Sequence, residues 1–86
     1  MFENVKNIID EWDPIDLITM NSPSDEYDTE IRHILDKIDS NINEKELSLI
    51  IYNLFLEEFG DDDFHKTKED CLEIATKIIN ELEMYN

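Results

Sequence analysis

The sequence predicts an all-α protein, a single domain of 86 residues arranged as a four-helix bundle. Three observations support this prediction. Apolar residues recur at helical spacing in four separate segments. The chain contains one glycine and two prolines, too few for the many turns of an all-β fold. Polar capping residues stand before several of the segments. An apolar fraction of 41% is sufficient for one core at this length.

The first helix is expected over about residues 2–11, followed by a structured connection with a short helical turn over about residues 14–18. Pro14 disfavours the α conformation of Asp13, so the first helix should end there. Asp13 is then expected to act as the N-cap of the short turn, with Pro14 at its first position. Trp12 is expected in the core. The apolar face of this helix consists of Val5, Ile8, Ile9 and Trp12.

The second helix is expected over about residues 24–39. Two start signals compete, because either Ser22 before Pro23 or Ser24 can serve as the N-cap. Either start places acidic side chains in the first turn, where the helix dipole favours negative charge. The predicted apolar face consists of Tyr27, Ile31, Ile34, Leu35 and Ile38.

The third helix is expected over about residues 44–59, with Asn43 and Glu46 as a capping box and Gly60 as its stop. It is apolar almost all round, which indicates a central position in the bundle with some surplus for a dimer contact. One of its stripes consists of Leu47, Ile50, Ile51, Leu54 and Phe55, and the other of Leu49, Tyr52, Leu56 and Phe59.

The fourth helix is expected over about residues 67–84, opened by a second capping box of Thr67 and Asp70. Cys71 lies on its apolar stripe and is expected to be a small core residue. The stripe contains Cys71, Ile74, Ala75, Ile78, Ile79 and Leu82.

The connection and the start of the second helix resemble a known family. Trp12-Asp13-Pro14-Ile15, followed by Pro23-x-Asp25-Glu26-Tyr27-Asp28-x-Glu30-Ile31, is similar to the YugE-like family of small acidic helical bacterial proteins. The family pattern has glycine where this chain has Asp16. The resemblance covers about a quarter of the chain. It implies a small all-helical domain, and it transfers no activity because the family has no assigned function.

The charge narrows the classes of partner. The chain has 23 acidic against 7 basic residues, a net charge of −16. Nucleic acid phosphates and anionic membranes would be repelled, so neither is expected as a partner. A basic protein would be attracted, although the same charge also serves solubility. No apolar run approaches the length of a membrane span, the N-terminus has no secretory signal pattern, and one cysteine forms no internal disulfide; we therefore expect a cytoplasmic protein.

The sequence offers no convincing catalytic or metal site. Cys71 with His33 or His65 is a weak candidate for a nucleophilic pair, because the cysteine falls on an apolar face. The acidic run 61–63 and His65 lack the ligand set of a dedicated metal site, and a loop starting at Asp39 fails the calcium-loop pattern. We therefore expect no enzyme activity, no cofactor and no bound metal.

The leading functional hypothesis is a small acidic protein-binding module, an inhibitor or immunity-type partner of a basic protein. Nuclease-neutralising proteins share this size and charge, but the Tyr-Tyr-Pro contact motif of the colicin immunity family is missing. The expected contact surface is Asp25, Glu26, Tyr27 and Asp28, provided that Tyr27 is not consumed by the core. The alternative is a homo-oligomeric structural or scaffold protein that uses the third helix as a homodimer contact.

Overall fold

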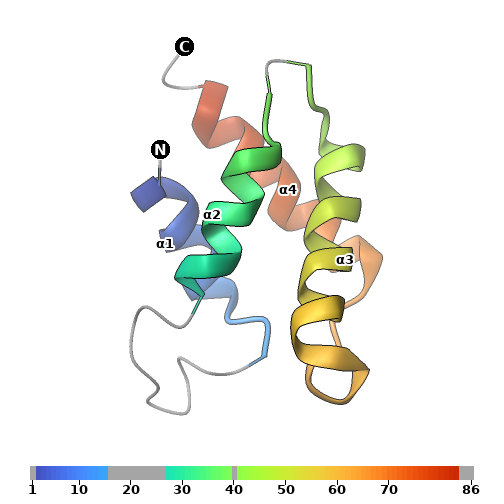
Figure 1. Ribbon diagram of the computed structural model, residues 1–86. Coiled ribbons are helices and arrows are strands. Elements are labelled where there is room, and N and C mark those ends of the chain that lie inside the picture. Colours follow the sequence, from blue (N-terminus) through green and yellow to red (C-terminus); the bar gives the residue numbers. More distant parts are fainter. Residues whose placement is uncertain (1, 16–26, 40, 84–86) are drawn as a thin grey trace.

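The computed structural model describes residues 2–15, 27–39 and 41–83, and its helices confirm the all-α prediction (Figure 1). No strand occurs among these residues. The helix bounds agree closely with those expected from the sequence, except that the described part of the second helix begins later. The four helices are α1 (Phe2–Trp12), α2 (Asp28–Lys37), α3 (Glu44–Asp63) and α4 (Lys68–Glu83).

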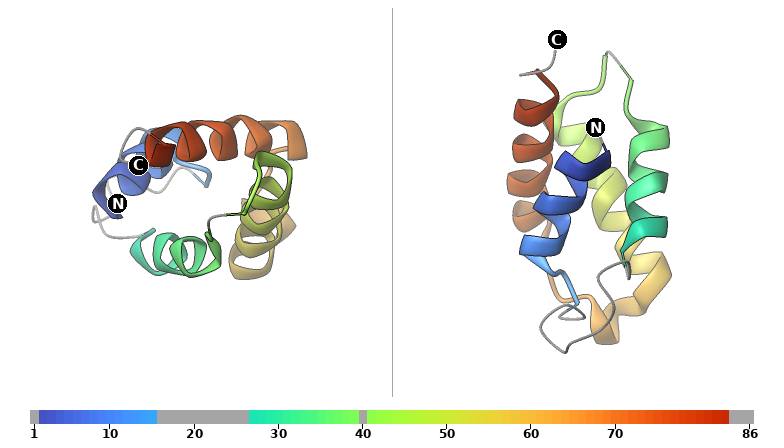
Figure 2. Two further views of the ribbon diagram at one scale, coloured as in Figure 1. Left: turned by 90° about the horizontal axis from the view of Figure 1, so that it is seen from above. Right: turned by 90° about the vertical axis from the view of Figure 1, so that its left-hand side faces the viewer.

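The helices form a ring in which each packs on two neighbours, in the cyclic order α1, α2, α3 and α4. Figure 2 shows this ring from above. The α3–α4 pair has the most extensive contact and the α2–α3 pair the least. The start of α1 and the end of α4 lie at the same end of the bundle (Figure 1). The seam between α2 and α3 is therefore the least tightly closed side of the bundle.

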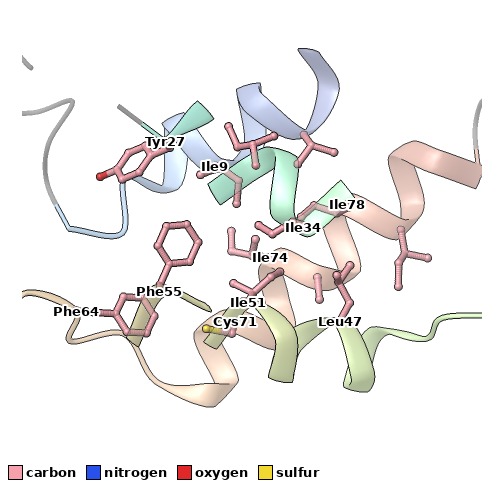
Figure 3. Close-up of a cluster of buried hydrophobic side chains, with 14 residues drawn as sticks. Ile9, Tyr27, Ile34, Leu47, Ile51, Phe55, Phe64, Cys71, Ile74 and Ile78 are labelled. Atoms are coloured by element: carbon pink, nitrogen blue, oxygen red, sulfur yellow. The ribbon is translucent and has the colours of Figure 1, made fainter. Parts of the chain in front are cut away.

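The core contains the apolar faces that helical spacing predicts, except for Leu49 and Ile50 of α3, and its aromatic rings are concentrated at one end (Figure 3). Phe55 of α3 stacks on Phe64 at a centroid distance of 5.8 Å. Trp12 is half-buried and meets Phe55 edge-on at 5.9 Å, so its expected packing against the core is found although the side chain is not fully enclosed. The fully buried side chains are Val5, Ile9, Tyr27, Ile31, Ile34, Leu47, Ile51, Phe55, Cys71, Ala75 and Ile78.

Asp13 ends α1, but in a different conformation from the one predicted. Its φ of 49° is left-handed, and its N–H donates to the Ile9 carbonyl at 2.8 Å, as in an αL helix C-terminus. An N-cap has an extended backbone, so the prediction that Asp13 caps a following turn is wrong. Asp tolerates this conformation better than most residues. Most of the predicted turn over residues 14–18 lies outside the described residues, as do the competing caps Ser22 and Ser24.

The predicted capping box of α4 is confirmed; at α3 the predicted N-cap Asn43 is confirmed, but Glu46 accepts from the Asn43 side chain and not from its backbone N–H. Asn43 Oδ1 accepts from the Glu46 N–H at 2.8 Å, and the Asn43 side chain donates back to Glu46 at 3.3 Å. At α4 the Asp70 N–H donates to Thr67 Oγ1 at 3.1 Å and the Thr67 backbone N–H donates to the Asp70 carboxylate, which is the full reciprocal pair. Gly60 interrupts α3 with φ 75° and ψ 167°, a region essentially restricted to glycine. The main body of α3 thus stops where the sequence predicts, and a further helical turn follows.

The α4 capping box predicts an acid-sensitive contribution to stability. The Thr67 backbone N–H donates to Asp70 Oδ2 at 2.9 Å, which holds the pKa of Asp70 below its ordinary value of 3.8. Its stabilisation is therefore complete above pH 3.8 and is lost as pH falls through the lower folded-state pKa. We expect Asp70→Asn to melt earlier than wild type at pH 7, with the difference shrinking below pH 3.8. Circular dichroism melts across pH, with Glu73→Gln as control, test this; a pH-independent difference would contradict it.

Candidate functional site

The predicted contact residue Tyr27 is part of the core. Its ring is fully buried and lies edge-on to Phe55 at 6.1 Å. Its hydroxyl donates to Asp13 Oδ1 at 2.7 Å and accepts from the Ile15 backbone N–H at 3.3 Å. Figure 3 shows the ring beside Phe55. The side chain therefore fastens the end of α1 to the start of α2, and the expectation that it contacts a partner is wrong because it has no exposed surface.

Asp28 is held by an ion pair inside the protein. Lys6 Nζ of α1 lies 2.8 Å from Asp28 Oδ1 and 3.2 Å from Asp10 Oδ2, joining the first turn of α2 to α1. Burial alone would lower the pKa of Lys6, but its hydrogen bonds to Asp28 and Asp10 outweigh burial and raise that pKa above 10.5. The Asp28 side chain is only 23% exposed. Much of its charge is thus already compensated by Lys6.

The surface expected at the start of α2 is therefore reduced. Tyr27 is excluded by its burial, and Asp28 keeps a partner role only as a prediction. Asp25 and Glu26 lie outside the described residues. The aromatic residue of that surface is part of the core instead.

The second half of α3 carries the densest exposed charge in the described part of the chain. Five acidic side chains occur within seven residues, all exposed to solvent, and no ion pair within the described residues engages them. They surround Gly60, whose left-handed backbone redirects the chain between them. The five are Glu57, Glu58, Asp61, Asp62 and Asp63, named here the α3 acidic segment. This segment offers an uncompensated negative surface to a basic partner.

A groove of about 520 Å³ runs along the α2–α3 seam. Its apolar side chains are Ile50 and Leu54 of α3, both half-buried. Its polar lining comes from both helices: His33, Asp36 and Lys37 of α2, and Asn53 and Glu57 of α3. Helical spacing places Ile50 on an apolar stripe that was expected to face the core, so this groove was not predicted. The available signal was the nearly all-round apolar surface of α3, which exceeds what its two neighbours, α2 and α4, can cover.

A second groove, of about 300 Å³, lies between α1 and α4. Its apolar lining includes Trp12, which is half-buried, and Ile74, which is buried. Its charged lining mixes signs closely, with Glu11, Asp70, Glu73, Lys66 and Lys77. Because three acids and two lysines line this groove together, it provides no clear charge preference for a ligand.

Cys71 of α4, the candidate nucleophile, is fully buried in the core of the bundle. Burial raises the pKa of its thiol to about 12. A thiol needs to ionise near neutral pH to act as a nucleophile, so this environment suits a core residue. Within residues 2–15, 27–39 and 41–83, no group of three or more His, Cys, Asp or Glu side chains is arranged to hold a metal ion.

Comparisons with protein-family models, curated proteins and solved structures found no match to this chain. The resemblance to the YugE-like family is not tested by them and stays a prediction. Among the described helices, none combines the length and apolar character needed to cross a membrane.

Proposed function

We propose that this protein is a small acidic protein-binding module whose partner is a basic protein, of the inhibitor or immunity type. The observation that carries the proposal is the uncompensated charge. All seven lysine and arginine residues lie in the described part of the chain, against 23 acids in the whole chain. Lys6 is paired with two carboxylates, while Arg32 and Lys68 lie over the Phe2 and Tyr52 rings. Few cations thus remain to neutralise the exposed acids.

The proposed contact surface includes the α3 acidic segment. Its charges are exposed and unpaired among the described residues, so they act together on an approaching cation. Such a field accelerates encounter with a basic protein and weakens with salt. A cytoplasmic location and the absence of catalysis belong to the same proposal; the burial of Cys71 supports the latter.

A charge-matched pair of variants tests this function. One variant replaces the acids of the α3 acidic segment by their amides. The control replaces five exposed acids of α1 and α4 by glutamine: Glu3, Glu11, Glu69, Glu73 and Glu83. Both variants have the same net charge, so general attraction is equal.

We expect immobilised wild type to retain a defined basic protein from a lysate at low salt and to release it at high salt. The α3 variant should lose most of this retention and the control variant little. The association rate of the purified pair, measured by stopped flow, should follow the same order. Equal losses in both variants would contradict a localised surface, and retention of no basic protein would contradict the function.

The alternative is a homo-oligomer formed through α3. The observation in its favour is Leu49, whose side chain is 45% exposed on α3, together with Leu72 on the adjacent α4, which is 42% exposed. Against it stands the repulsion between two copies that each carry −16. Sedimentation velocity decides between them: a dimer that persists at low salt and is lost in Leu49→Ser favours the alternative.

A further inference from the structure

The groove between α2 and α3 combines an apolar floor with exposed acids at its rim. Ile50 and Leu54 supply the floor, and Asp36 and Glu57 supply negative charge on opposite helices. Lys37 is the basic residue of the lining. Beyond Glu57, α3 continues into the rest of the α3 acidic segment. A ligand that presents apolar side chains inward and positive charge towards Asp36, Glu57 and the α3 acidic segment would therefore suit this groove.

Ile50 is not required to complete the core. Leu54 packs against the buried cluster, whereas the half-buried Ile50 is not among the side chains that do so. An isoleucine that lies in a groove without core contacts leaves apolar surface in water, which is unfavourable by about 25 cal/mol per Å². A partner that covered the exposed part of Ile50 would therefore gain binding free energy.

The dimensions of the groove fit a helix. Its α3 wall runs from Ile50 to Glu57, eight residues whose seven steps of 1.5 Å span about 10 Å. That length matches two turns of a docked helix, which would present apolar residues at i and i+3 or i+4. The described residues form no strand, so they offer no sheet edge to an extended peptide.

We propose that the α2–α3 groove binds a basic amphipathic helix of the partner protein, with Ile50 and Leu54 as the apolar floor. The proposal rests on the proposed function and adds the form in which the basic partner is recognised. Charge complementarity selects this occupant over a second copy of the chain, since two copies would bring like charges together at the rim.

Three single substitutions separate the groove from the rest of α3. Ile50→Ser removes the free apolar floor without removing a core contact. Leu49→Ser is the matched control, because Leu49 is adjacent in sequence, is 45% exposed and does not line the groove. Asn53→Arg is a second test, since it adds bulk and positive charge to the groove from an exposed position. Circular dichroism melts of each variant serve as the control for folding.

The probe is a synthetic 18-residue helical peptide with leucines on one face and lysines on the other. A scrambled peptide of the same composition and an amphipathic peptide with glutamates in place of lysines are the comparisons. Binding is followed by ¹⁵N–¹H correlation spectra of the full chain at two salt concentrations. The perturbed amides locate the contact, and the titration gives the dissociation constant.

We expect the basic amphipathic peptide to perturb amides that flank the groove, including those of Ile50 and Asn53. Ile50→Ser should weaken binding about three- to tenfold, because binding can bury only the part of the isoleucine that is still exposed in the free protein. Asn53→Arg should weaken it at least as much, and Leu49→Ser by less than about twofold.

Other outcomes overturn the proposal in distinguishable ways. If the scrambled peptide binds equally well and Ile50→Ser has no effect, the attraction is electrostatic only; the groove assignment fails and the proposed function survives. If the glutamate peptide binds the groove as tightly as the lysine peptide, the proposal that the partner is basic is contradicted. A wild-type dimer that Ile50→Ser dissociates would show that a second copy covers the groove, which also contradicts the proposal.

Discussion

Replacing Phe55 by alanine is expected to lower the free energy of unfolding by about 3–5 kcal/mol, the range for large aromatic truncations in cores. Phe55 is fully buried. Its ring lies within 6.1 Å, centroid to centroid, of four others: Trp12, Tyr27, Phe59 and Phe64. Phe59 belongs to α3 itself, and the other three rings belong to α1, the start of α2 and the segment after α3, so the cavity would loosen these three parts together.

Urea denaturation followed by circular dichroism measures this loss. Leu72→Ala is the matched control, because Leu72 is 42% exposed and its truncation should cost less than about 1 kcal/mol. A loss at Phe55 no larger than the loss at Leu72 would mean that the neighbouring rings close the cavity without strain. The cluster would then not be the centre of the core.

Local signals in the sequence predicted the helices well, because each depends on residues close together in the chain. Asn43 and Glu46, or Thr67 and Asp70, need only three-residue spacing to form their hydrogen bonds. Gly60 needs only its own backbone freedom to end the body of α3. The apolar faces follow from the 3.6-residue repeat. None of these features requires knowledge of what lies across the bundle.

The role of Tyr27 could not be predicted in the same way. Tyrosine has an apolar ring and a polar tip, so its position on a helical stripe is compatible with burial or with an exposed contact. The deciding partner is Asp13, fourteen residues away along the chain. That hydrogen bond depends on how α1 ends and where α2 begins. Acidic neighbours in the sequence favoured a contact surface, but burial of the ring decides for the core.

The groove at Ile50 was missed for a related reason. Helical spacing places Ile50 beside Ile51 and Leu54, which are core-facing, and no sequence signal separates them. The difference comes from the limited contact between α2 and α3, a property of how the ring of helices closes. The groove on α3 is thus left open because α2 covers α3 incompletely. The surface predicted at the start of α2 is lost because Tyr27 is completely buried.

Removing the Tyr27 hydroxyl is expected to be costly because it deprives a buried carboxylate of a close donor. Asp13 is only 7% exposed, and its Oδ1 accepts from the Tyr27 hydroxyl at 2.7 Å. A hydrogen bond to a charged group contributes about 1.5–3 kcal/mol, so Tyr27→Phe should lower the free energy of unfolding by about this amount. The ring and its contacts with Phe55 remain, which isolates the hydroxyl.

A double-mutant cycle with Asp13→Gly tests this coupling. Glycine is chosen because Asp13 has φ 49°, where alanine would add backbone strain to the loss of the carboxylate. In the Asp13→Gly background Tyr27→Phe should lower the free energy of unfolding clearly less than in wild type, because no buried carboxylate then loses a hydrogen-bond donor. Urea denaturation of the four proteins gives the coupling energy, expected at about 1–3 kcal/mol. Effects that add within about 0.5 kcal/mol would show that the hydroxyl and the carboxylate act independently, and that the aromatic contacts and the Lys6–Asp28 ion pair hold the start of α2 against α1 without help from this hydrogen bond.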